Sequence, residues 1–494
     1  MVFNSYTFIV FFGLVLLLHY SSLSWKAKKL SLLLSSYLFY AVWNPPFILL
    51  LWLSTWVDYR VALALGKEER QRRRKVLLVI SLLVNLGMLG FFKYGGFLLD
   101  NFVAMVSLLG INYQPANPDI ILPVGISFYT FQTLSYTLDV YRRKFSPEKS
   151  LLDFSLFVTF FPQLVAGPIV RPGELIPQFK VPHQATAAQR TQGLFLLTLG
   201  LFMKVGLADG LLAAPSDAVF GAPFPLAPLD AWTGVLAFSG QIFFDFAGYS
   251  TCAIGAALSL GFVLPDNFRY PYAAIGFSDF WRRWHITLSS WLRDYLYIPL
   301  GGSRKGAART YLNLMITMLL GGLWHGASWT FVAWGALHGV FLSVERLFRG
   351  RLARFPRKPL TTTAQPVISQ ASVIPSVKFG RQMGKFILAM LTFLLVSISW
   401  VFFRAPDFDT AVRLLLAMFG VIPTRIPLLT TLDIYKVLGI VAAMLACHWL
   451  MRNTSVATVA GRTPWWVLGL GWALMLMVLV LTQKSTGSFI YFQF

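Results

Sequence analysis

Apolar runs recur along almost the whole chain, from Phe8 to Val480, and no long polar stretch separates them. A helix needs about 20 consecutive apolar residues to cross the hydrocarbon core of a bilayer. The pattern therefore predicts an all-α polytopic membrane protein with about 11 crossings. We expect it to form a single integral membrane domain over residues 1–494.

The predicted spans differ in length and in how they end. The first, within residues 1–20, lacks the basic n-region and cleavage site of a signal peptide, so we expect it to be retained. Asn44-Pro45-Pro46 interrupts the apolar stretch 30–65, which predicts a membrane hairpin because proline stops helices. Runs as short as 312–322 cannot cross alone, so some helices are expected to be tilted, re-entrant or interfacial. The other predicted spans are 76–92, 120–140, 151–170, 194–214, 232–264, 331–347, 386–403, 434–450 and 465–481.

Basic residues gather between the apolar runs. The chain has 42 Lys and Arg against 20 Asp and Glu, a formal net charge of +22. Cytoplasmic loops of membrane proteins carry an excess of Lys and Arg. We therefore expect the clusters at 26–29, 67–75 and 346–358 to face the cytoplasm and the N-terminus to lie on the other side. This distribution argues against a nucleic-acid partner and makes membrane lipid the expected surroundings.

Composition narrows the class further. Charged residues make up 13% of the chain, whereas soluble domains carry roughly 25%. This excludes an ordinary water-soluble enzyme, a disordered chain, a collagen and a coiled coil. The two cysteines, Cys252 and Cys447, lie far apart inside apolar runs, so we expect neither a disulfide framework nor a cysteine metal site.

The tract 267–309 differs in kind from the apolar spans. It mixes tryptophans and tyrosines with arginines and aspartates, among them Trp281, Arg282, Arg283 and Asp279. Such a composition suits a helix at the membrane surface or one that lines a wet cavity. A belt that only anchors the protein in the interface would have the same aromatic residues.

One histidine lies deep in an apolar segment. His325 belongs to the stretch 318–339, MLLGGLWHGASWTFVAWGALHG. An ionisable residue in a membrane span is costly unless it is paired or faces water, so it marks a candidate functional site. The alternative is a buried histidine held by its packing. His338 lies thirteen residues further on, about 220° around a helix, so we expect it to be a packing or hydrogen-bonding residue outside that site.

Other chemistries leave little trace in the sequence. The segment 248–252 lacks the last glycine of a serine-hydrolase elbow, and we find no zinc-protease motif and no P-loop. Asp245 is an acid within an apolar run, and such acids often line ion paths. A transporter or flippase is therefore an alternative, although a carboxylate paired with a buried arginine or hydroxyl explains Asp245 as well.

Several strings together carry a family resemblance. They are PVGISFYTFQTLSYTLDVYR at 123–142, FFPQLVAGPIVRP at 160–172, FFDFAGYS at 243–250, the tract 267–302 with WRRWHITLS, LLGGLWHGASWTFVAWGALHG at 319–339, and the terminal FIYFQF. The chain resembles the membrane-bound O-acyltransferase (MBOAT) family, in the bacterial branch that O-acetylates exopolysaccharides of the alginate and cellulose type. The core motifs cover about 120–345. The basic segment at about 349–381 matches none of them and is expected to be a cytoplasmic loop.

The resemblance implies a fold and a site. The fold would be a ring of tilted helices around a narrow tunnel, open to the cytoplasm for an acyl donor and to the other face for the acceptor. His325 corresponds to the family's membrane histidine and His285 to its second polar site residue. The donor would be acetyl-CoA, with no metal. The expected partners are a periplasmic SGNH-type acetyltransferase and a polysaccharide synthesis and secretion complex at the bacterial inner membrane.

The chemistry of the residues agrees with those roles. A neutral imidazole suits a general base at physiological pH, so we expect His325 to take the proton of the attacking hydroxyl. Transient acetylation of His325 as a nucleophile stays open. His285 or a neighbouring tryptophan N–H is a candidate donor to the oxyanion. For the donor we expect contacts from Arg282, Arg283, Arg304 and Lys305, which suit its phosphates, and from Trp281 and Trp284. Positive-inside topology explains the same cations equally well.

Overall fold

The computed structural model describes residues 1–116, 119–354, 375–421, 427–482 and 489–490, and every regular element in these ranges is a helix. This confirms the predicted all-α class. Eight of the described helices are long and apolar enough to cross a membrane, and the apolar helix α1 (Tyr6–Tyr20) is shorter. The expected number of about 11 crossings is not confirmed by this count.

The eight candidate spans are distributed along the whole chain. Some consist of more than one segment: a short 3-10 turn precedes α3, and α9 continues through a π-helical stretch into α10. They are Pro45–Lys67 with α3 (Ile48–Lys67), α4 (Gln71–Leu108), Ala187–Phe220 with α9 (Ala187–Leu201) and α10 (Ala213–Phe220), α11 (Pro228–Ser259), and parts of α15 (Trp329–Arg354) and α16 (Pro375–Arg404), followed by α18 (Thr431–Met451) and α20 (Trp465–Thr482).

Four sequence predictions need correction. Helix α4 continues to Leu108, well beyond the predicted end at residue 92. The predicted span 151–170 is wrong, because the chain forms two short helices, α6 (Leu151–Thr159) and α7 (Phe161–Leu164), which break at Phe160, shortly before Pro162 in the first turn of α7. The segment 312–322 belongs to a 19-residue helix, α14 (Ala307–His325). The expected loop 349–381 is helical at both ends, in α15 and α16, and its middle lies outside the described residues.

Helices α9 and α11 approach one another through two pairs of glycines. A Cβ added at Gly200 would lie 2.5 Å from the carbonyl oxygen of Gly248, and one at Gly255 would lie 2.5 Å from that of Gly193. Small residues let helix backbones pack this closely in membranes. Helix α11 is accordingly the most enclosed of the candidate spans, with 83% of its most apolar window buried.

Helices α14 and α15 form an equally close pair. A Cβ at Gly322 would lie 2.3 Å from the carbonyl oxygen of Phe331, and one at Gly335 would lie 2.3 Å from that of Met318. The glycines of the histidine-bearing segment therefore serve helix packing. This contact fixes the part of α14 that leads to His325.

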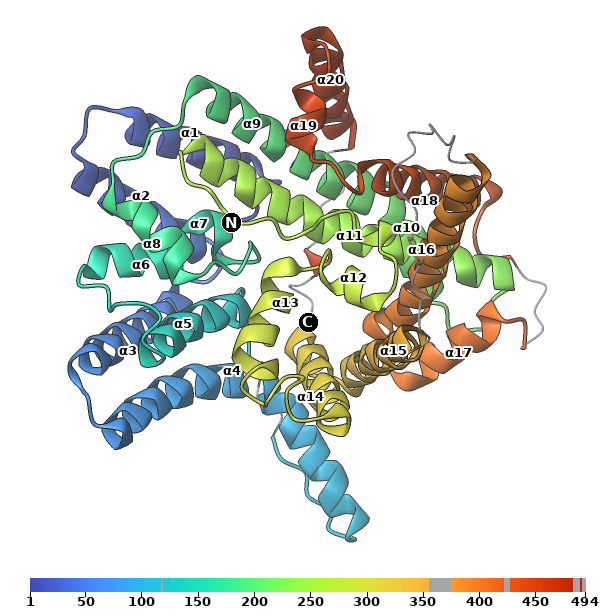
Figure 1. Cartoon of the computed structure of the whole chain (residues 1–494), viewed down its shortest axis with the longest axis horizontal. Coiled ribbons are helices and arrows are strands. Elements are labelled where there is room, and N and C mark those ends of the chain that lie inside the picture. Colours follow the sequence, from blue (N-terminus) through green and yellow to red (C-terminus); the bar gives the residue numbers. More distant parts are fainter. Residues whose placement is uncertain (117–118, 355–374, 422–426, 483–488, 491–494) are drawn as a thin grey trace, which may run out of the picture.

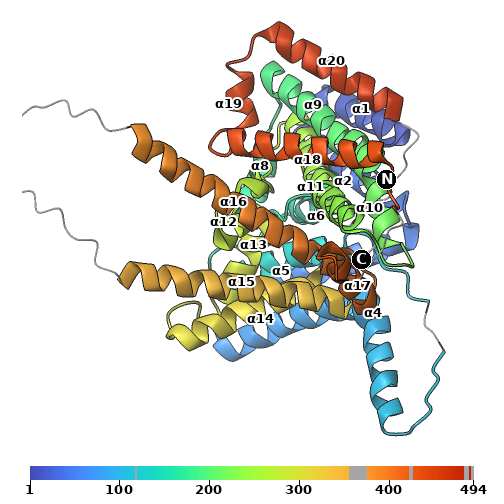
Figure 2. The same ribbon diagram turned by 90° about the vertical axis from the view of Figure 1, so that its right-hand side faces the viewer.

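Longer helices surround a central group of short ones. Figure 1 shows α12 (Phe277–Trp281) and α13 (Ile286–Leu292) near the middle of the molecule, with α14 and α15 on one side and α11 on another. In Figure 2, α15 and α16 lie next to each other and α20 forms an outer edge. The middle of the tract 267–309, where Trp284 and His285 are completely buried, thus lies inside the protein and is not an interfacial belt, whereas residues 303–309 are exposed.

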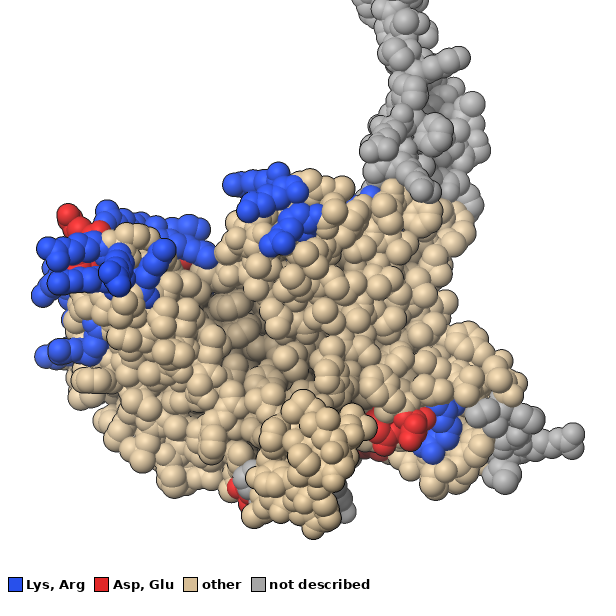
Figure 3. Space-filling model, turned by 90° about the horizontal axis from the view of Figure 1, so that it is seen from below, with Lys and Arg blue, Asp and Glu red and all other residues tan. Residues whose placement is uncertain are grey.

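Charged side chains gather at one edge of the molecule. In Figure 3 most visible Lys and Arg side chains lie along the upper edge, and a smaller acidic and basic group lies at the opposite edge. Lys29 pairs with Asp153, close in sequence to Pro147, and Pro147 packs against Gly66 near the end of α3. The basic clusters 26–29 and 67–75 consequently lie at the same end of the helix bundle.

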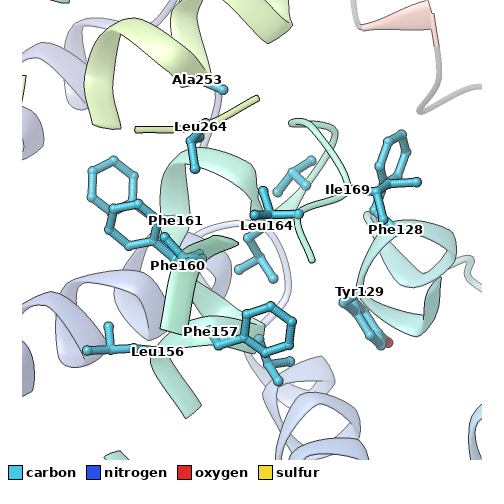
Figure 4. Close-up of a cluster of buried hydrophobic side chains, with 14 of the residues drawn as sticks. Phe128, Tyr129, Leu156, Phe157, Phe160, Phe161, Leu164, Ile169, Ala253 and Leu264 are labelled. Atoms are coloured by element: carbon cyan, nitrogen blue, oxygen red, sulfur yellow. The ribbon is translucent and has the colours of Figure 1, made fainter. Parts of the chain in front are cut away.

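A core of aromatic and aliphatic residues fills the N-terminal half. The short helices α6 and α7 lie inside it, with Phe157, Phe160 and Phe161 fully buried. Figure 4 shows these phenylalanines with Leu164, and on the other side Phe128 and Tyr129 of α5 (Ile126–Tyr141). The apolar run 151–170 is therefore protein interior rather than a lipid-facing span.

Candidate active site around His325 and His285

His325 is the last residue of α14. The next residue, Gly326, has an extended backbone, so the chain leaves the helix abruptly at this point. The His325 side chain is buried, and its ring lies about 5 Å from those of Trp324, Trp334 and Phe403, at 5.0, 5.1 and 5.2 Å between centroids. The packing of α14 against α15 brings the imidazole into an aromatic enclosure.

His285 precedes α13 in a left-handed backbone conformation, with φ +42°. Such a conformation costs about 1–3 kcal/mol in a non-glycine residue and is concentrated at functional sites. The side chain is completely buried, with Phe246 at 4.7 Å and Trp324 at 5.8 Å between ring centroids. Neither ring nitrogen has a hydrogen-bond partner among the residues that the structure describes. Two buried nitrogens without partners and a strained backbone make His285 a candidate functional residue.

The two histidines lie next to each other. Their ring centroids are 6.4 Å apart, and the planes meet at 84°. The indole N–H groups of Trp324 and Trp334 are buried and also lack an acceptor within the described parts of the chain. Buried donors are almost always paired in folded proteins. Free donors around two imidazoles are therefore suited to a reacting oxygen.

A recess reaches His325 from outside. Its lining includes Trp324, His325, Ser127 and Lys93, together with residues 122–126 and 165–166. Gly125, with φ +78°, begins α5 there, and a Cβ at this position would lie 2.9 Å from the carbonyl oxygen of Leu164. The close turn lets the chain pass beside the recess, and His325, although buried, borders it.

Lys93 and Tyr94 of α4 contact the end of α14. Lys93 Nζ donates to the carbonyl oxygens of Trp324 and His325, and Tyr94 donates to that of Leu323. Both lie beyond the predicted span 76–92, and for this reason we missed them in the sequence. The available signal was a single cation in the apolar run FFKYGG, since intramembrane ionisable residues mark functional sites.

The predicted donor-binding residues have different surroundings. Arg282 is mostly exposed, whereas Arg283 is enclosed by Asp279 and by the carbonyl oxygens of Arg269 and Arg452. Partial burial disfavours the ionised Asp279 carboxylate, but the N–H of Ile275 and the guanidinium of Arg283, with Arg452, hold its pKa below the ordinary value. Arg283 thus forms an ion pair with Asp279.

Trp281 and Trp284 lie in an aromatic cluster. Trp284 is fully buried and stacks on Phe280, and its ring lies 5.1 Å from that of Trp400. Trp281 contacts His338, whose Nε2 lies 3.1 Å from Ser399 Oγ. His338 is a hydrogen-bonding residue, as predicted. Neither tryptophan lines the recess at His325.

Arg304 and Lys305 are exposed and precede the first turn of α14. Nineteen residues of helix at 1.5 Å each separate them from His325 by roughly 28 Å. They therefore lie at the opposite end of α14 from the imidazole. Any ligand that contacts both ends must be long.

A second cationic group was not predicted. The guanidinium carbons of Arg171 and Arg142 lie 4.3 and 5.2 Å from the ring centroid of Tyr295, and Arg171 also pairs with Asp294 at 3.3 Å. Arg171 Nη1 is buried without a hydrogen-bond partner among the described residues. Arg142 directly follows α5, where Arg74 binds the carbonyl oxygen of Tyr141, so this group lies at the basic end of the bundle. A partly exposed guanidinium with one donor lacking a partner suits a phosphate.

Asp245 has a different partner from the arginine or hydroxyl we expected. Lys204 Nζ lies 2.5 Å from Asp245 and 2.8 Å from Asp209, and the backbone N–H of Ile490 donates to the other Asp245 oxygen. An acid that is paired in this way has a structural role, and a functional role is not needed to explain its burial. No observation at Asp245 favours an ion path.

Comparison with known proteins identifies relatives over most of the chain. The model of the MBOAT, membrane-bound O-acyltransferase family matches residues 3–377. The probable alginate O-acetylase AlgI of Pseudomonas putida is 37% identical over the full length of both chains, and that of Pseudomonas aeruginosa is 41% identical over 85% of this chain and 75% of its own. The peptidoglycan O-acetyltransferase of Helicobacter pylori is 38% identical over 85% of this chain and 80% of its own.

Proposed function

Because the chain belongs to the membrane-bound O-acyltransferase family, we propose that it moves acetyl groups from cytoplasmic acetyl-CoA, through the site at His325, for the O-acetylation of an exported polysaccharide. The chain is an O-acyltransferase, since the family and its O-acetyltransferase relatives share that activity. Relatives named for alginate and peptidoglycan support a glycan as the final acceptor. The observation that carries the proposal is the pair of neighbouring buried imidazoles, one of which borders a recess.

In the proposed reaction His325 is the general base. Its neutral imidazole takes the proton of the acceptor hydroxyl as the hydroxyl oxygen attacks the thioester carbonyl carbon. The tetrahedral intermediate collapses, the carbon–sulfur bond breaks, and the proton passes to the CoA sulfur. Positioned acid–base catalysis of this kind contributes typically 10²- to 10⁴-fold. Acetylation of His325 itself, with CoA leaving first, would use the same residue as a nucleophile.

The buried N–H donors have a role in the same step. His285 and the indole groups of Trp324 and Trp334 lie around His325 without acceptors among the described residues. Donors fixed in a dry site stabilise an oxyanion as it develops, and each is worth about 10²- to 10³-fold. The neutral form of His285 can donate from one nitrogen only. These groups are our candidates for the oxyanion contact.

The donor would bind at the basic end of the bundle. Arg171, Arg142, Arg282, Arg304 and Lys305 are the candidate phosphate contacts, since guanidinium and ammonium groups bind phosphate through charge-assisted bonds. Arg283 is a weaker candidate because Asp279 and two carbonyl oxygens engage it. Acetyl-CoA suits this arrangement, because a long arm separates its phosphates from its thioester.

The proposed function also includes a cellular location and partner proteins. We place the protein in the bacterial inner membrane as a single domain, with the acceptor reaching the site from the periplasmic side. A periplasmic SGNH-type acetyltransferase would pass the acetyl group on within a polysaccharide synthesis and secretion complex. The alternative of a transporter or flippase has no specific support, because Asp245 pairs with Lys204.

The decisive experiment replaces the imidazole. His325→Ala should abolish transfer of labelled acetyl from acetyl-CoA in the purified system with its periplasmic partner, while the protein still inserts and unfolds at its usual temperature. His183→Ala is the matched control, because it removes a partly exposed histidine away from the site, whose ring lies beside a loop carbonyl. Normal acetylation of the polymer by His325→Ala would overturn the proposal. Loss of polymer export with an unchanged acetyl content would favour the transporter.

A further inference from the structure

The end of α14 lies inside the protein, and its carbonyl groups need donors. The last four carbonyls of any helix have no partner within the helix. Many helices continue into a left-handed glycine that satisfies them. Here Gly326 is extended instead, with φ −162° and ψ 153°, so the backbone after His325 does not fold back. The donors must come from another part of the chain.

Two consecutive residues of α4 supply them. Lys93 Nζ donates to the carbonyl oxygen of Trp324 at 2.7 Å and to that of His325 at 3.0 Å. The Tyr94 hydroxyl donates to the carbonyl oxygen of Leu323 at 2.8 Å. Residues 93–94 thus bind the three successive carbonyls 323–325. A positive charge at this place also opposes the partial negative charge of the helix C-terminus.

The third ammonium proton of Lys93 points to another helix. Lys93 Nζ lies 3.4 Å from Ser127 Oγ in α5, and it lies 5.8 Å from the ring centroid of Trp324. An ammonium group has three donors and no acceptor, so all three are engaged. Lys93 therefore joins α4, α5 and the end of α14. It also lines the recess that contains His325.

A lysine is a costly way to end a helix in an apolar environment. An intramembrane charge is tolerated when it is paired or serves function. Here the ammonium is placed where the helix end carries His325, and the neighbouring Tyr94 holds the preceding carbonyl. The backbone of residue 325 is thereby fixed on its carbonyl side by α4. On its other side α15 fixes the helix at Gly322.

We propose that Lys93 and Tyr94 are positioning residues for the acyl transfer: they hold the carbonyl end of α14 so that the His325 imidazole keeps its place beside His285. The inference rests on the proposed role of His325. It assigns no bond to the substrate, and it predicts an effect on turnover rather than on donor binding. Displacement of a reacting group by about 1 Å can cost 10²-fold in rate.

The test compares three variants with a matched control. Lys93→Met removes the charge and keeps the length, Lys93→Arg keeps a charged donor, and Tyr94→Phe removes one hydroxyl. Tyr20→Phe is the control, because the Tyr20 hydroxyl donates at 2.7 Å to the carbonyl oxygen of Ser259, the last residue of α11. That bond is the same kind of helix-end contact, away from His325.

We expect a split between kcat and KM. Lys93→Met should lower kcat about 10²-fold, with KM for acetyl-CoA changed by less than about twofold. Lys93→Arg should recover at least about a tenth of the lost rate, and Tyr94→Phe should lower kcat about three- to tenfold. Tyr20→Phe should keep the kcat of the unaltered protein.

Each result decides the inference separately from the proposed function. If His325→Ala is inactive while Tyr94→Phe and Lys93→Met keep full kcat, the positioning role is wrong and the His325 role stands. An active His325→Ala removes the premise itself. If Lys93→Met does not fold, Lys93→Arg and Tyr94→Phe carry the test, and an unchanged kcat in both overturns the inference. An equal loss of kcat in Tyr20→Phe would show that any weakened helix end has this effect and would also overturn it.

Discussion

The rings of His285 and His325 lie 6.4 Å apart and nearly perpendicular, at 84°. His285 makes no hydrogen bond to its neighbour, because both of its ring nitrogens lack a partner among the described residues. The two imidazoles are held separately, one by the strained turn before α13 and the other by the end of α14. Under the proposed function, they would act on one reacting group from two directions.

Two replacements of His285 distinguish the effect of its left-handed backbone from the effect of losing its side-chain hydrogen-bond donor. His285→Ala should lower turnover about 10²- to 10³-fold, as loss of a donor to the oxyanion does. His285→Asn keeps a side-chain donor and tolerates the left-handed backbone, so it should keep more activity than the alanine variant. The measurement is kcat with labelled acetyl-CoA. An unaltered rate in His285→Ala would make the histidine a structural residue.

Replacement of Arg171 tests the phosphate contact. Arg171→Gln should raise KM for acetyl-CoA about tenfold, the loss of affinity expected when one charge-assisted hydrogen bond to phosphate is removed. The kcat should be nearly unchanged. The control is Arg269→Gln, since Arg269 is exposed and pairs with the exposed Asp266. Surface pairs of that kind are worth little. Equal KM values for both variants and the unaltered protein would exclude Arg171 from donor binding.

Helix packing near the site gives a stability prediction. Gly322→Ala places a Cβ against the carbonyl oxygen of Phe331, so α14 and α15 must separate. Overpacking of this kind costs about 1–3 kcal/mol, and we expect both a lower Tm in detergent and a reduced kcat, because His325 is one turn away. Gly87→Ala is the control, because nothing lies within 4 Å of its added Cβ. A Tm for Gly322→Ala equal to that of the control contradicts the close contact.

The ion pairs of Asp279 predict a pH dependence of stability. Asp279 binds Arg283 at 3.1 Å and Arg452 at 2.7 Å, and these contacts outweigh burial and lower its pKa. Their contribution is complete above the unfolded pKa of about 3.9 and is lost as the pH falls through the lower pKa of the folded state. Asp279→Asn should reduce stability by about 1–3 kcal/mol at pH 7. The difference in Tm should narrow below about pH 4, and a constant difference would contradict the assignment.

The sequence was most informative about the candidate site where a single ionisable residue lies within an apolar segment. The cost of a histidine within an apolar segment made His325 a candidate site residue, and the resemblance added His285. The structure brings these two together although separate segments carry them. Their orientation could not be predicted, because it depends on the turn at His285 and on the carbonyl contacts from α4.

Apolar patterning was less informative about environment. The run 151–170 has the composition of a membrane span, yet α6 and α7 are buried in protein. Lipid and a protein core select the same side chains, so hydropathy does not distinguish them. The predicted span ended at residue 92 for another reason, because Lys93 interrupts the apolar run although the helix continues to Leu108. Charge alone likewise could not separate Arg283, which is held by Asp279, from the exposed Arg282.

The length of α14 has a consequence for the choice of acyl donor. Its basic end and its histidine end are roughly 28 Å apart. Under the proposed function, the length of α14 therefore sets the distance that the acyl donor must span. A compact donor such as acetyl phosphate carries its charge within a few bonds of the acyl group and cannot touch both ends at once. Selectivity for a thioester on a long arm, such as that of acetyl-CoA, would then follow from the length of the donor. No pocket that recognises the acetyl group would be needed.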